Sequence, residues 1–437
     1  MVGDTIVTFA TRATLFVVSA VTGILTARLM GPEGRGIYYL LVTYMGLLVL
    51  SGGFGLEASN VYYGAKSDVD RSSLFWNSVF SGAGLGILMI IVGWLVYVSF
   101  PEPFRGLDTK VVHLALFSLP WTMVNLFLIE LTLGLQDVIY YNFLSAVQRG
   151  SVLLFLVLLL PLWPQVYVAM AAHLGAQMVT TGIIVGYFAR RRIITSRPRA
   201  NWRLLAKALS YGVRSQIGNV LLFLNFRLAA FMINFFSDPA QVGVYSIAVI
   251  LAESLWHVSS SAATVALPRI SASQSLARSA MLASRSARLA VLSTAVLAVG
   301  MGLISPWVID FLFGSDFQQA APALAILLPG IVIFSLEYVL ASYIAGRGYP
   351  QYVTLVAFIA LLVAIGSNLW LVPRWGINGA ALASTISYAV ATVSAVYFYK
   401  RLSGARLSDM LVPTREDWTY LRAYFEDLYR NLARQGD

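Results

Sequence analysis

The chain has 437 residues, of which 58% are hydrophobic and only 11% are charged, whereas soluble proteins carry roughly 25% charged residues. This composition excludes a soluble domain and predicts an all-α polytopic membrane protein. Cysteine is absent, which excludes disulfides and thiolate sites, and three scattered histidines argue against a metal site. The net charge of +10 does not indicate nucleic-acid binding, because the basic residues stand between apolar runs.

Apolar runs recur along the whole length, and each is long enough to cross a bilayer, which takes roughly 20 residues. The first run lacks a basic leader and a small-residue cleavage site, so we expect an uncleaved span and not a signal peptide. We predict about twelve spans. They cover approximately residues 5–29, 36–63, 74–99, 111–133, 141–160, 166–189, 208–236, 241–266, 288–312, 321–344, 351–371 and 377–399.

The cations between the spans predict the orientation of the chain. The even-numbered connections hold fourteen Lys and Arg residues, and the odd-numbered connections hold five. Because cytoplasmic connections carry the excess of positive charge, both termini are expected in the cytoplasm. The longest basic linker, 190–207, falls between the sixth and seventh spans, where a two-lobed protein would join its halves.

A short motif follows the first span and returns after the seventh, 207 residues later at each position. Its two copies are Pro32, Gly36 and Tyr38, and Pro239, Gly243 and Tyr245. Proline stops the incoming helix, glycine allows the next helix to pack closely, and tyrosine suits the membrane edge. Six spans separate the copies, so the two halves share one orientation and form a parallel pseudo-repeat about the membrane normal.

The two turns are predicted to act as hinges on which the lobes rock. The hinge residues are Gly31, Pro32, Gly34, Gly36, Pro239 and Gly243. Arg35 lies inside the first turn, and the charge count places that turn outside the cell. Arg35 could meet a departing glycan there, but we interpret it as a solvated turn residue.

The repeat and the basic linker predict four segments. They are an N-terminal six-helix lobe at 1–189, a basic cytoplasmic linker at 190–207, a C-terminal six-helix lobe at 208–402 and a cytoplasmic tail at 403–437. In the tail, Thr414–Asp417 has the pattern of a capping box, and apolar residues from Trp418 to Leu432 repeat at helical spacing. The tail is therefore predicted to form an amphipathic helix on the inner leaflet.

Charged side chains within spans are costly and usually face a cavity, so they are the first functional candidates. Arg12 lies about two turns into the first span, and Thr8, Ser19 and Thr26 share its side of the helix at about 100° per residue. Small residues also mark helix–helix contacts. An arginine within this polar stripe favours a water-filled cavity.

Other arginines lie in the fifth and seventh spans. Arg149 is about two turns into the fifth span, and the seventh carries Arg214, Asn225 and Arg227. Arg214 shares a face with Asn225 but lies near the cytoplasmic end, where it would snorkel. Arg227 lies near mid-membrane and is the stronger candidate.

Acidic residues within the spans are candidates for ion coupling. Glu253 and His257 are one turn apart in the eighth span, which is the spacing of a proton relay or of a local hydrogen bond. A structural pair between Glu253 and a buried arginine is an equal alternative. The chain contains no Ser–His–Asp pattern, P-loop or close carboxylate pair, so we do not predict an enzyme.

Six segments, in this order and spacing, resemble the oligosaccharide flippases. They are Gly31–Tyr38 (Gly-Pro-Glu-Gly-Arg-Gly-Ile-Tyr), Gly53–Glu57, Leu224–Arg227, Pro239–Tyr245, Leu267–Ile270 and Gly376–Leu382. These flippases form the polysaccharide-transporter branch of the superfamily that also holds the multidrug and toxic-compound extruders and the lipid II flippases. The resemblance covers residues 1–402. Twelve spans favour the oligosaccharide branch, because the lipid II branch typically has fourteen.

The chain departs from this family in the seventh span. In many relatives an aspartate follows the arginine by two residues, often with another arginine next, whereas Ala229 and Ala230 occupy these places. The ion-coupling role of that aspartate has no counterpart here. Glu253 with His257, or Glu337 in the tenth span, would have to replace it.

The resemblance implies two six-helix bundles around a central cavity that opens alternately to each side. The implied substrate is an oligosaccharide on polyprenyl pyrophosphate, moved to the outer leaflet of a bacterial plasma membrane for O-antigen, capsule or exopolysaccharide synthesis. Arginine matches phosphate oxygens bidentately. The hypothesis gives Arg12, Arg149 and Arg227 to the pyrophosphate, Arg214 to the cytoplasmic entrance, and Thr8, Ser19, Thr26 and Asn225 to the glycan path.

No cofactor is expected. Transport would be driven by a proton gradient, a sodium gradient or the membrane potential. The expected partners are the lipid-linked oligosaccharide and membrane lipids, with a polysaccharide polymerase or glycosyltransferases as candidate protein partners. A multidrug exporter of the same superfamily is the alternative, although organic cations would favour acids and aromatics over arginines. A non-transporting scaffold is a third hypothesis. The amphipathic tail and the Ala229–Ala230 pair allow it, and the polar stripe of the first span opposes it.

Overall fold

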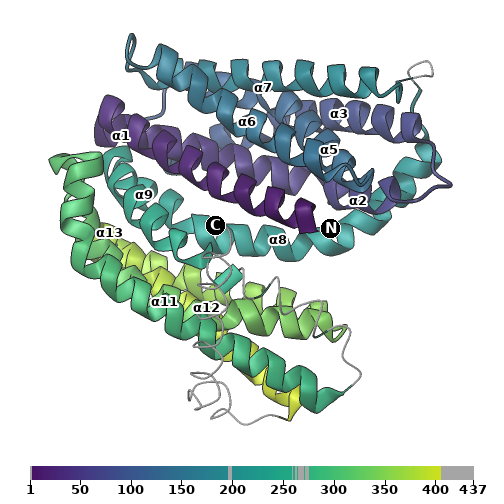
Figure 1. The fold of residues 1–437 in the computed structure, drawn as a ribbon. Coiled ribbons are helices and arrows are strands. Elements are labelled where there is room, and N and C mark those ends of the chain that lie inside the picture. The colour runs from purple at the N-terminus through teal and green to yellow at the C-terminus, as the bar shows by residue number, and fades with distance from the viewer. Residues whose placement is uncertain are drawn as a thin grey trace, which may run out of the picture. The chain divides into compact units, whose positions relative to one another are not determined.

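The computed structural model describes residues 2–194, 199–257, 259, 260, 263, 270 and 275–404, and the predicted amphipathic tail lies outside them. Within these residues the regular structure is entirely helical (Figure 1). The helices are α1 (Val2–Gly52), α2 (Leu56–Gly64), α3 (Arg71–Ser99), α4 (Thr109–Phe117), α5 (Leu119–Gly134), α6 (Val138–Leu159), α7 (Val166–Arg190), α8 (Trp202–Phe236), α9 (Pro239–Ser254), α11 (Leu276–Phe313), α12 (Ala320–Gly346) and α13 (Pro350–Ser403). Short 3₁₀ helices, η1 (Glu102–Phe104) and η2 (Ser315–Phe317), lie in two connections.

In the described part of the chain, nine helices are long and apolar enough to cross a membrane. Two of them correspond to two predicted spans each. Residues 13–52 of α1 and the 54 residues of α13 have helical path lengths of about 60 Å and about 80 Å, at least twice the roughly 30 Å apolar core of a bilayer. Each bends at a glycine with positive φ, Gly31 at +66° and Gly376 at +52°. α9 occupies the place of the eighth predicted span, and the prediction of an all-α polytopic membrane protein is confirmed.

The described residues divide into two compact units. The first holds residues 2–250, 306–323 and 368–380, and the second holds the described residues of 251–305, 324–367 and 381–404. α8 and the first twelve residues of α9 thus belong to the unit that contains the first six predicted spans. This division differs from the lobes predicted at 1–189 and 208–402, which remain a prediction from the sequence repeat.

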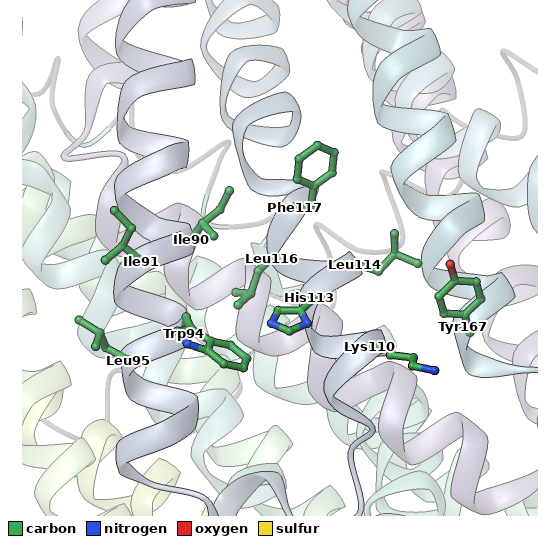
Figure 2. A pocket seen from close by; sticks show the side chains of 10 residues that line it. All are labelled: Ile90, Ile91, Trp94, Leu95, Lys110, His113, Leu114, Leu116, Phe117 and Tyr167. Atoms are coloured by element: carbon green, nitrogen blue, oxygen red, sulfur yellow. The ribbon is translucent and has the colours of Figure 1, made fainter.

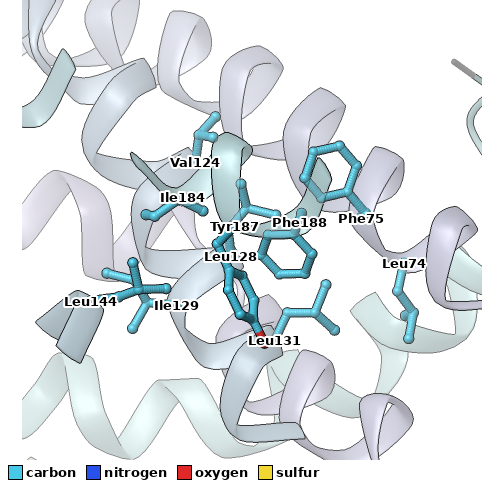
Figure 3. Packing of buried hydrophobic residues seen from close by; sticks show 10 residues of the cluster. All are labelled: Leu74, Phe75, Val124, Leu128, Ile129, Leu131, Leu144, Ile184, Tyr187 and Phe188. Carbon is cyan, nitrogen blue, oxygen red and sulfur yellow. The ribbon is translucent and has the colours of Figure 1, made fainter. Parts of the chain in front are cut away.

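The first unit is held together by an apolar cluster of α3, α5, α6 and α7 (Figure 3). Its buried members are Leu74, Phe75, Val124, Leu128, Ile129, Leu131, Leu144, Ile184, Tyr187 and Phe188. Beside it, the side-chain amide of Asn60 on α2 donates to the hydroxyl of Ser78 (2.9 Å) and to the carbonyl of Phe127 (2.9 Å). Lipid provides no hydrophobic drive between helices, so such polar bonds and close packing orient α2, α3 and α5.

The two copies of the repeated turn pack directly against each other within the first unit. A Cβ on Gly36 would lie 1.7 Å from the carbonyl oxygen of Pro239, and a Cβ on Gly243 would lie 1.9 Å from that of Pro32. The contact is reciprocal between sequence-equivalent positions, and only glycine allows the backbones this close. Gly36 and Gly243 are therefore packing residues, and their role as hinges remains a prediction.

The start of α3 is capped by Asp70. Its carboxylate accepts hydrogen bonds from the backbone N–H groups of Ser72 (3.2 Å) and Ser73 (2.9 Å) and from the Ser73 hydroxyl (2.7 Å). The Ser73 hydroxyl is the main cause that lowers the pKa of Asp70 below its ordinary value, and the backbone N–H groups add to it. These bonds satisfy donors that the first turn of a helix leaves unpaired.

Asp70→Ala is expected to destabilise the protein by about 1 kcal/mol, because the cap is lost, whereas Asp70→Asn should retain most of the stability. The folded-state pKa is lower than the unfolded one, so the contribution of this cap is present above the unfolded pKa and is lost as pH falls through the folded pKa. Thermal unfolding of the detergent-solubilised protein at neutral and acidic pH measures both effects. Asp68→Ala, which removes a nearby exposed carboxylate, is the control, and equal melting temperatures for the two alanine variants would contradict the prediction.

Candidate functional site

A cavity of about 390 Å³ lies in the first unit between α1, α6 and α7. Its polar lining residues are Ser19, Thr22, Arg35, Tyr38, Tyr39, Gln148, Arg149, His173 and Gln177. These lining residues, all in the described part of the chain, include two arginines and no carboxylate. The cavity is therefore electropositive and suited to an anion.

Arg35 forms the buried wall of this cavity. Its Nη1 donates to the Thr26 hydroxyl (2.8 Å), and its Nε donates to the Ser246 hydroxyl on α9 (3.2 Å). The side chain is only 4% exposed, and its guanidinium carbon lies 5.8 Å from the centre of the Tyr39 ring. Two hydrogen bonds and a flanking ring fix the guanidinium plane before any ligand binds.

The interpretation of Arg35 as a solvated turn residue was wrong. Gly31 takes a positive φ that other residues rarely adopt, so α1 bends sharply and becomes helical again at once. Arg35 then lies in the first turns of the second helical half, close enough to the first half to reach Thr26. A count of charges between apolar runs treats every residue there as solvated, so it misses that the chain becomes helical again and buries Arg35.

Thr26 holds Arg35 in place and does not line an open path. It is fully buried, and its hydroxyl accepts from Arg35 while lying within hydrogen-bond distance of the Thr22 carbonyl (2.7 Å). Ser19, from the same predicted stripe, does line the cavity, and its hydroxyl donates to the carbonyl of Leu15 (2.9 Å). Thr8 lies elsewhere on α1 and accepts from the side-chain amide of Asn142 on α6 (3.1 Å).

The opposite wall comes from α6 and α7. Arg149 is exposed toward the cavity, and the neighbouring Gln148 donates to the side-chain oxygen of Gln177 (3.3 Å). The side-chain nitrogen of Gln177 lies 3.4 Å from Nε2 of His173. The side-chain amide of Asn125 on α5 donates to the side-chain oxygen of Gln177 (2.9 Å). This network positions one helix of the wall against the other, while Arg149 supplies charge.

Arg227 joins the site through Tyr39. Its Nη1 donates to the Tyr39 hydroxyl (3.2 Å), and the same tyrosine lines the cavity beside Arg35. Asn225, on the same helix, is buried. Ala229 and Ala230, also on α8, are buried packing residues.

Of the remaining predicted site residues, Glu253, His257 and Glu337 are not among the residues that line this cavity. Arg12 lies on α1 and Arg214 on α8, but their side chains are outside the described part of the structure. α9 ends at Ser254, Leu255 lies in a turn and residues 256–257 are helical again, and the ion-coupling role of Glu253 and His257 stays a prediction. Glu337 is buried on α12 in the second unit.

Seven polar residues in the described lining of the cavity were not among the predicted site residues: Thr22, Arg35, Tyr38, Tyr39, Gln148, His173 and Gln177. One signal was present, because His173 and Gln177 are one helical turn apart in an apolar span. Gln148 precedes the predicted Arg149 directly. Uncharged polar residues carry a weaker cost in a membrane than arginine does, so they stand out less.

Comparison with known proteins gives a family and a fold. The family model described as "Polysaccharide biosynthesis protein" matches residues 2–274. A curated relative, an uncharacterized membrane protein of Methanocaldococcus jannaschii, is 24% identical over 402 residues, covering 84% of this chain and 77% of the relative.

Three solved structures share the fold across nearly the whole chain. The inward closed lipid II flippase MurJ matches with a TM-score of 0.74 at 14% identity, covering 92% of this chain and 88% of that one. An inward-facing multidrug resistance MATE family transporter of the MOP superfamily matches at 0.73 and 16%, covering 90% and 94%. A MOP superfamily transporter from Pyrococcus furiosus, described as having a binding pocket of reverse polarity, matches at 0.59 and 13%, covering 92% and 94%. At these identities the likeness establishes the fold alone.

Proposed function

This chain belongs to the polysaccharide biosynthesis protein family, and we propose on that premise that it is a flippase for polyprenyl-pyrophosphate-linked oligosaccharides. It would move these units from the inner to the outer leaflet by alternating access, for surface polysaccharide synthesis. The proposed location is a bacterial plasma membrane, with both termini in the cytoplasm. One observation carries the proposal: a cavity among membrane helices holds Arg35 and Arg149, and its described lining residues include no carboxylate.

The chemistry of this cavity suits a pyrophosphate. A guanidinium presents a planar set of N–H donors that matches two phosphate oxygens at once, and its charge stays fixed. Arg35 is already oriented by Thr26 and Ser246, so little conformational freedom is lost when an anion binds. Arg149, which is exposed on the opposite wall, is free to approach the second phosphate.

The other lining residues suit a glycan. Ser19, Gln148 and Gln177 offer hydrogen-bonding groups for sugar hydroxyls, and the ring of Tyr39 offers an apolar face. Arg12, Arg214 and Arg227 remain proposed contacts along the path, with Arg227 one tyrosine removed from the cavity. Coupling to a proton or sodium gradient, through Glu253, His257 or Glu337, stays part of the proposal.

The lining charge also distinguishes the proposal from the two alternatives. An exporter of organic cations requires carboxylates or aromatic faces without competing cations, and two arginines in the lining oppose that substrate. A scaffold without transport activity has no need of a polar cavity within its spans, where each polar group is costly.

Reconstitution tests the function directly. In vesicles, the protein is expected to make a fluorescent polyprenyl-pyrophosphate oligosaccharide accessible to a glycosidase that cannot cross the membrane. Arg149→Ala should slow this transfer by about tenfold or more, because a charged hydrogen bond contributes about 1.5–3 kcal/mol. Arg149→Lys should recover only part of the rate, since the charge stays and the bidentate geometry is lost.

Arg374→Ala is the matched control, because Arg374 is exposed and donates to the Trp370 carbonyl on its own helix. It should transfer the substrate at the wild-type rate. If the protein transfers an organic cation such as ethidium but not the lipid-linked glycan, the proposed function would change from flippase to exporter. If the folded wild-type protein transfers neither substrate, the result would favour the scaffold.

A further inference from the structure

An open groove of about 710 Å³ lies on the first unit between α3, α4 and the start of α7 (Figure 2). It shares no lining residue with the cavity of Arg35. Large apolar side chains in it are exposed, including Ile91 (54%) and Phe117 (55%). On a multi-pass membrane protein, apolar side chains exposed at mid-span face lipid chains, so the groove is a concave part of the lipid-facing surface.

The groove is polar at one end and apolar at the other. Lys110 lies in the first turn of α4, and Tyr167 lies in the first turn of α7. Trp94, near the end of α3, is stacked on His113 with ring centroids 4.4 Å apart. Phe117 lies about 10 Å further along α4 than Lys110, and Figure 2 shows these two side chains at opposite ends of the groove.

We propose that this groove binds one anionic glycerophospholipid, with its phosphate at Lys110 and an acyl chain along Ile90, Ile91 and Phe117. The exposed ammonium of Lys110 complements a phosphate. Trp94 and Tyr167 are amphipathic rings of the kind that sit at headgroup level. In the predicted orientation this end faces outside, so the lipid comes from the outer leaflet.

The walls of the groove are fixed before the lipid arrives. The Trp94–His113 stack joins α3 to α4, and the Tyr97 hydroxyl lies within hydrogen-bond distance of the Leu107 carbonyl (3.4 Å) and the Thr109 hydroxyl (3.3 Å). The nearest acidic group in sequence, Asp108, accepts the backbone N–H of Lys110 (2.8 Å) and caps α4. The lipid site is independent of the substrate proposed for the other cavity.

Fluorescence quenching by brominated lipids tests the site, because Trp94 is in its wall. The part of the quenching that is present in the wild type and absent in Trp94→Phe comes from Trp94 and therefore reports on this groove alone. Dibrominated phosphatidylglycerol is expected to quench this component of the full chain in detergent at lower mole fraction than dibrominated phosphatidylcholine. Lys110→Gln should weaken the phosphatidylglycerol effect about fivefold, which corresponds to about 1 kcal/mol for one basic residue at a membrane surface.

Lys66→Gln, which removes another exposed lysine of the same unit, should leave the preference unchanged, and Lys110→Arg should retain it. Native mass spectrometry gives a second readout, in which the wild type retains one phosphatidylglycerol more than Lys110→Gln. Equal quenching by the two lipids, or an unchanged preference in Lys110→Gln, would overturn the proposal. The proposal would also be overturned if polyprenyl phosphate displaced the dibrominated phosphatidylglycerol at a lower concentration than unbrominated phosphatidylglycerol does. The occupant would then be the carrier lipid.

Discussion

Gly36→Ala is expected to disrupt the contact between the two copies of the repeated turn and to abolish most transport. The new Cβ would lie 1.7 Å from the carbonyl oxygen of Pro239 and 2.7 Å from its carbonyl carbon, so backbone must move. Overpacking typically costs about 1–3 kcal/mol, and a clash with backbone belongs at or above the top of that range. The measurements are the melting temperature of the purified protein and the transfer assay in vesicles, which follows accessibility of the glycan to the glycosidase.

The reciprocal geometry makes a second expectation. Gly243→Ala should have a similar effect, because its Cβ would lie 1.9 Å from the carbonyl oxygen of Pro32. The double variant should cost less than the two single variants together, since one displacement of the turns relieves both clashes. Strict additivity would indicate that the two turns do not share one contact.

The chain offers matched controls for a methyl added to a helical glycine. Nothing lies within 4 Å of the Cβ that would be built on Gly150 in α6 or Gly182 in α7. Alanine at either position should keep or raise the melting temperature, because alanine is favoured over glycine in a helix by about 1 kcal/mol. A Gly36→Ala protein as stable as Gly182→Ala would show that the turns are not in contact.

Arg35→Ala is expected to reduce transport by at least tenfold to a hundredfold at normal protein levels. The guanidinium is buried between Thr26 and Ser246 on one side and the cavity on the other, and each charged hydrogen bond it makes to the substrate contributes about 1.5–3 kcal/mol. Arg35→Lys should restore only a small part. The planar guanidinium can donate to the hydroxyls of Thr26 and Ser246 and, at the same time, to a phosphate. The single ammonium of lysine lacks this geometry.

Separate readouts distinguish substrate binding from structural support. Binding of inorganic pyrophosphate should raise the melting temperature of the wild type and of Arg374→Ala, and this shift should vanish in Arg35→Ala. Thr26→Val keeps the volume and removes the acceptor, so it should weaken the pyrophosphate shift without abolishing it. A full pyrophosphate shift in Arg35→Ala, alongside a lowered melting temperature, would make Arg35 a purely structural residue.

The sequence by itself determined the class of protein and predicted its spans, and the duplication stays a prediction from the repeated motif. Span length and low charge follow from the thickness and low polarity of the bilayer, which act on every residue locally. Gly31 and Pro32 break α1 for reasons of backbone geometry that are equally local. The repeated Pro and Gly spacing is visible without coordinates, because it is a property of the residue order.

Only the tertiary structure decided what the repeat and the turn arginine do. Gly36 meets Pro239 across 203 positions of sequence and Arg35 meets Ser246 across 211, and no periodicity in either segment specifies those partners. Arg28, at the end of the first predicted span, donates to the carbonyl of Leu312 (3.0 Å) at the end of α11. Charge counting assumes that a residue between spans is solvated, whereas long-range packing determines whether it is buried, and that difference moved Arg35 from the periphery into the proposed substrate cavity.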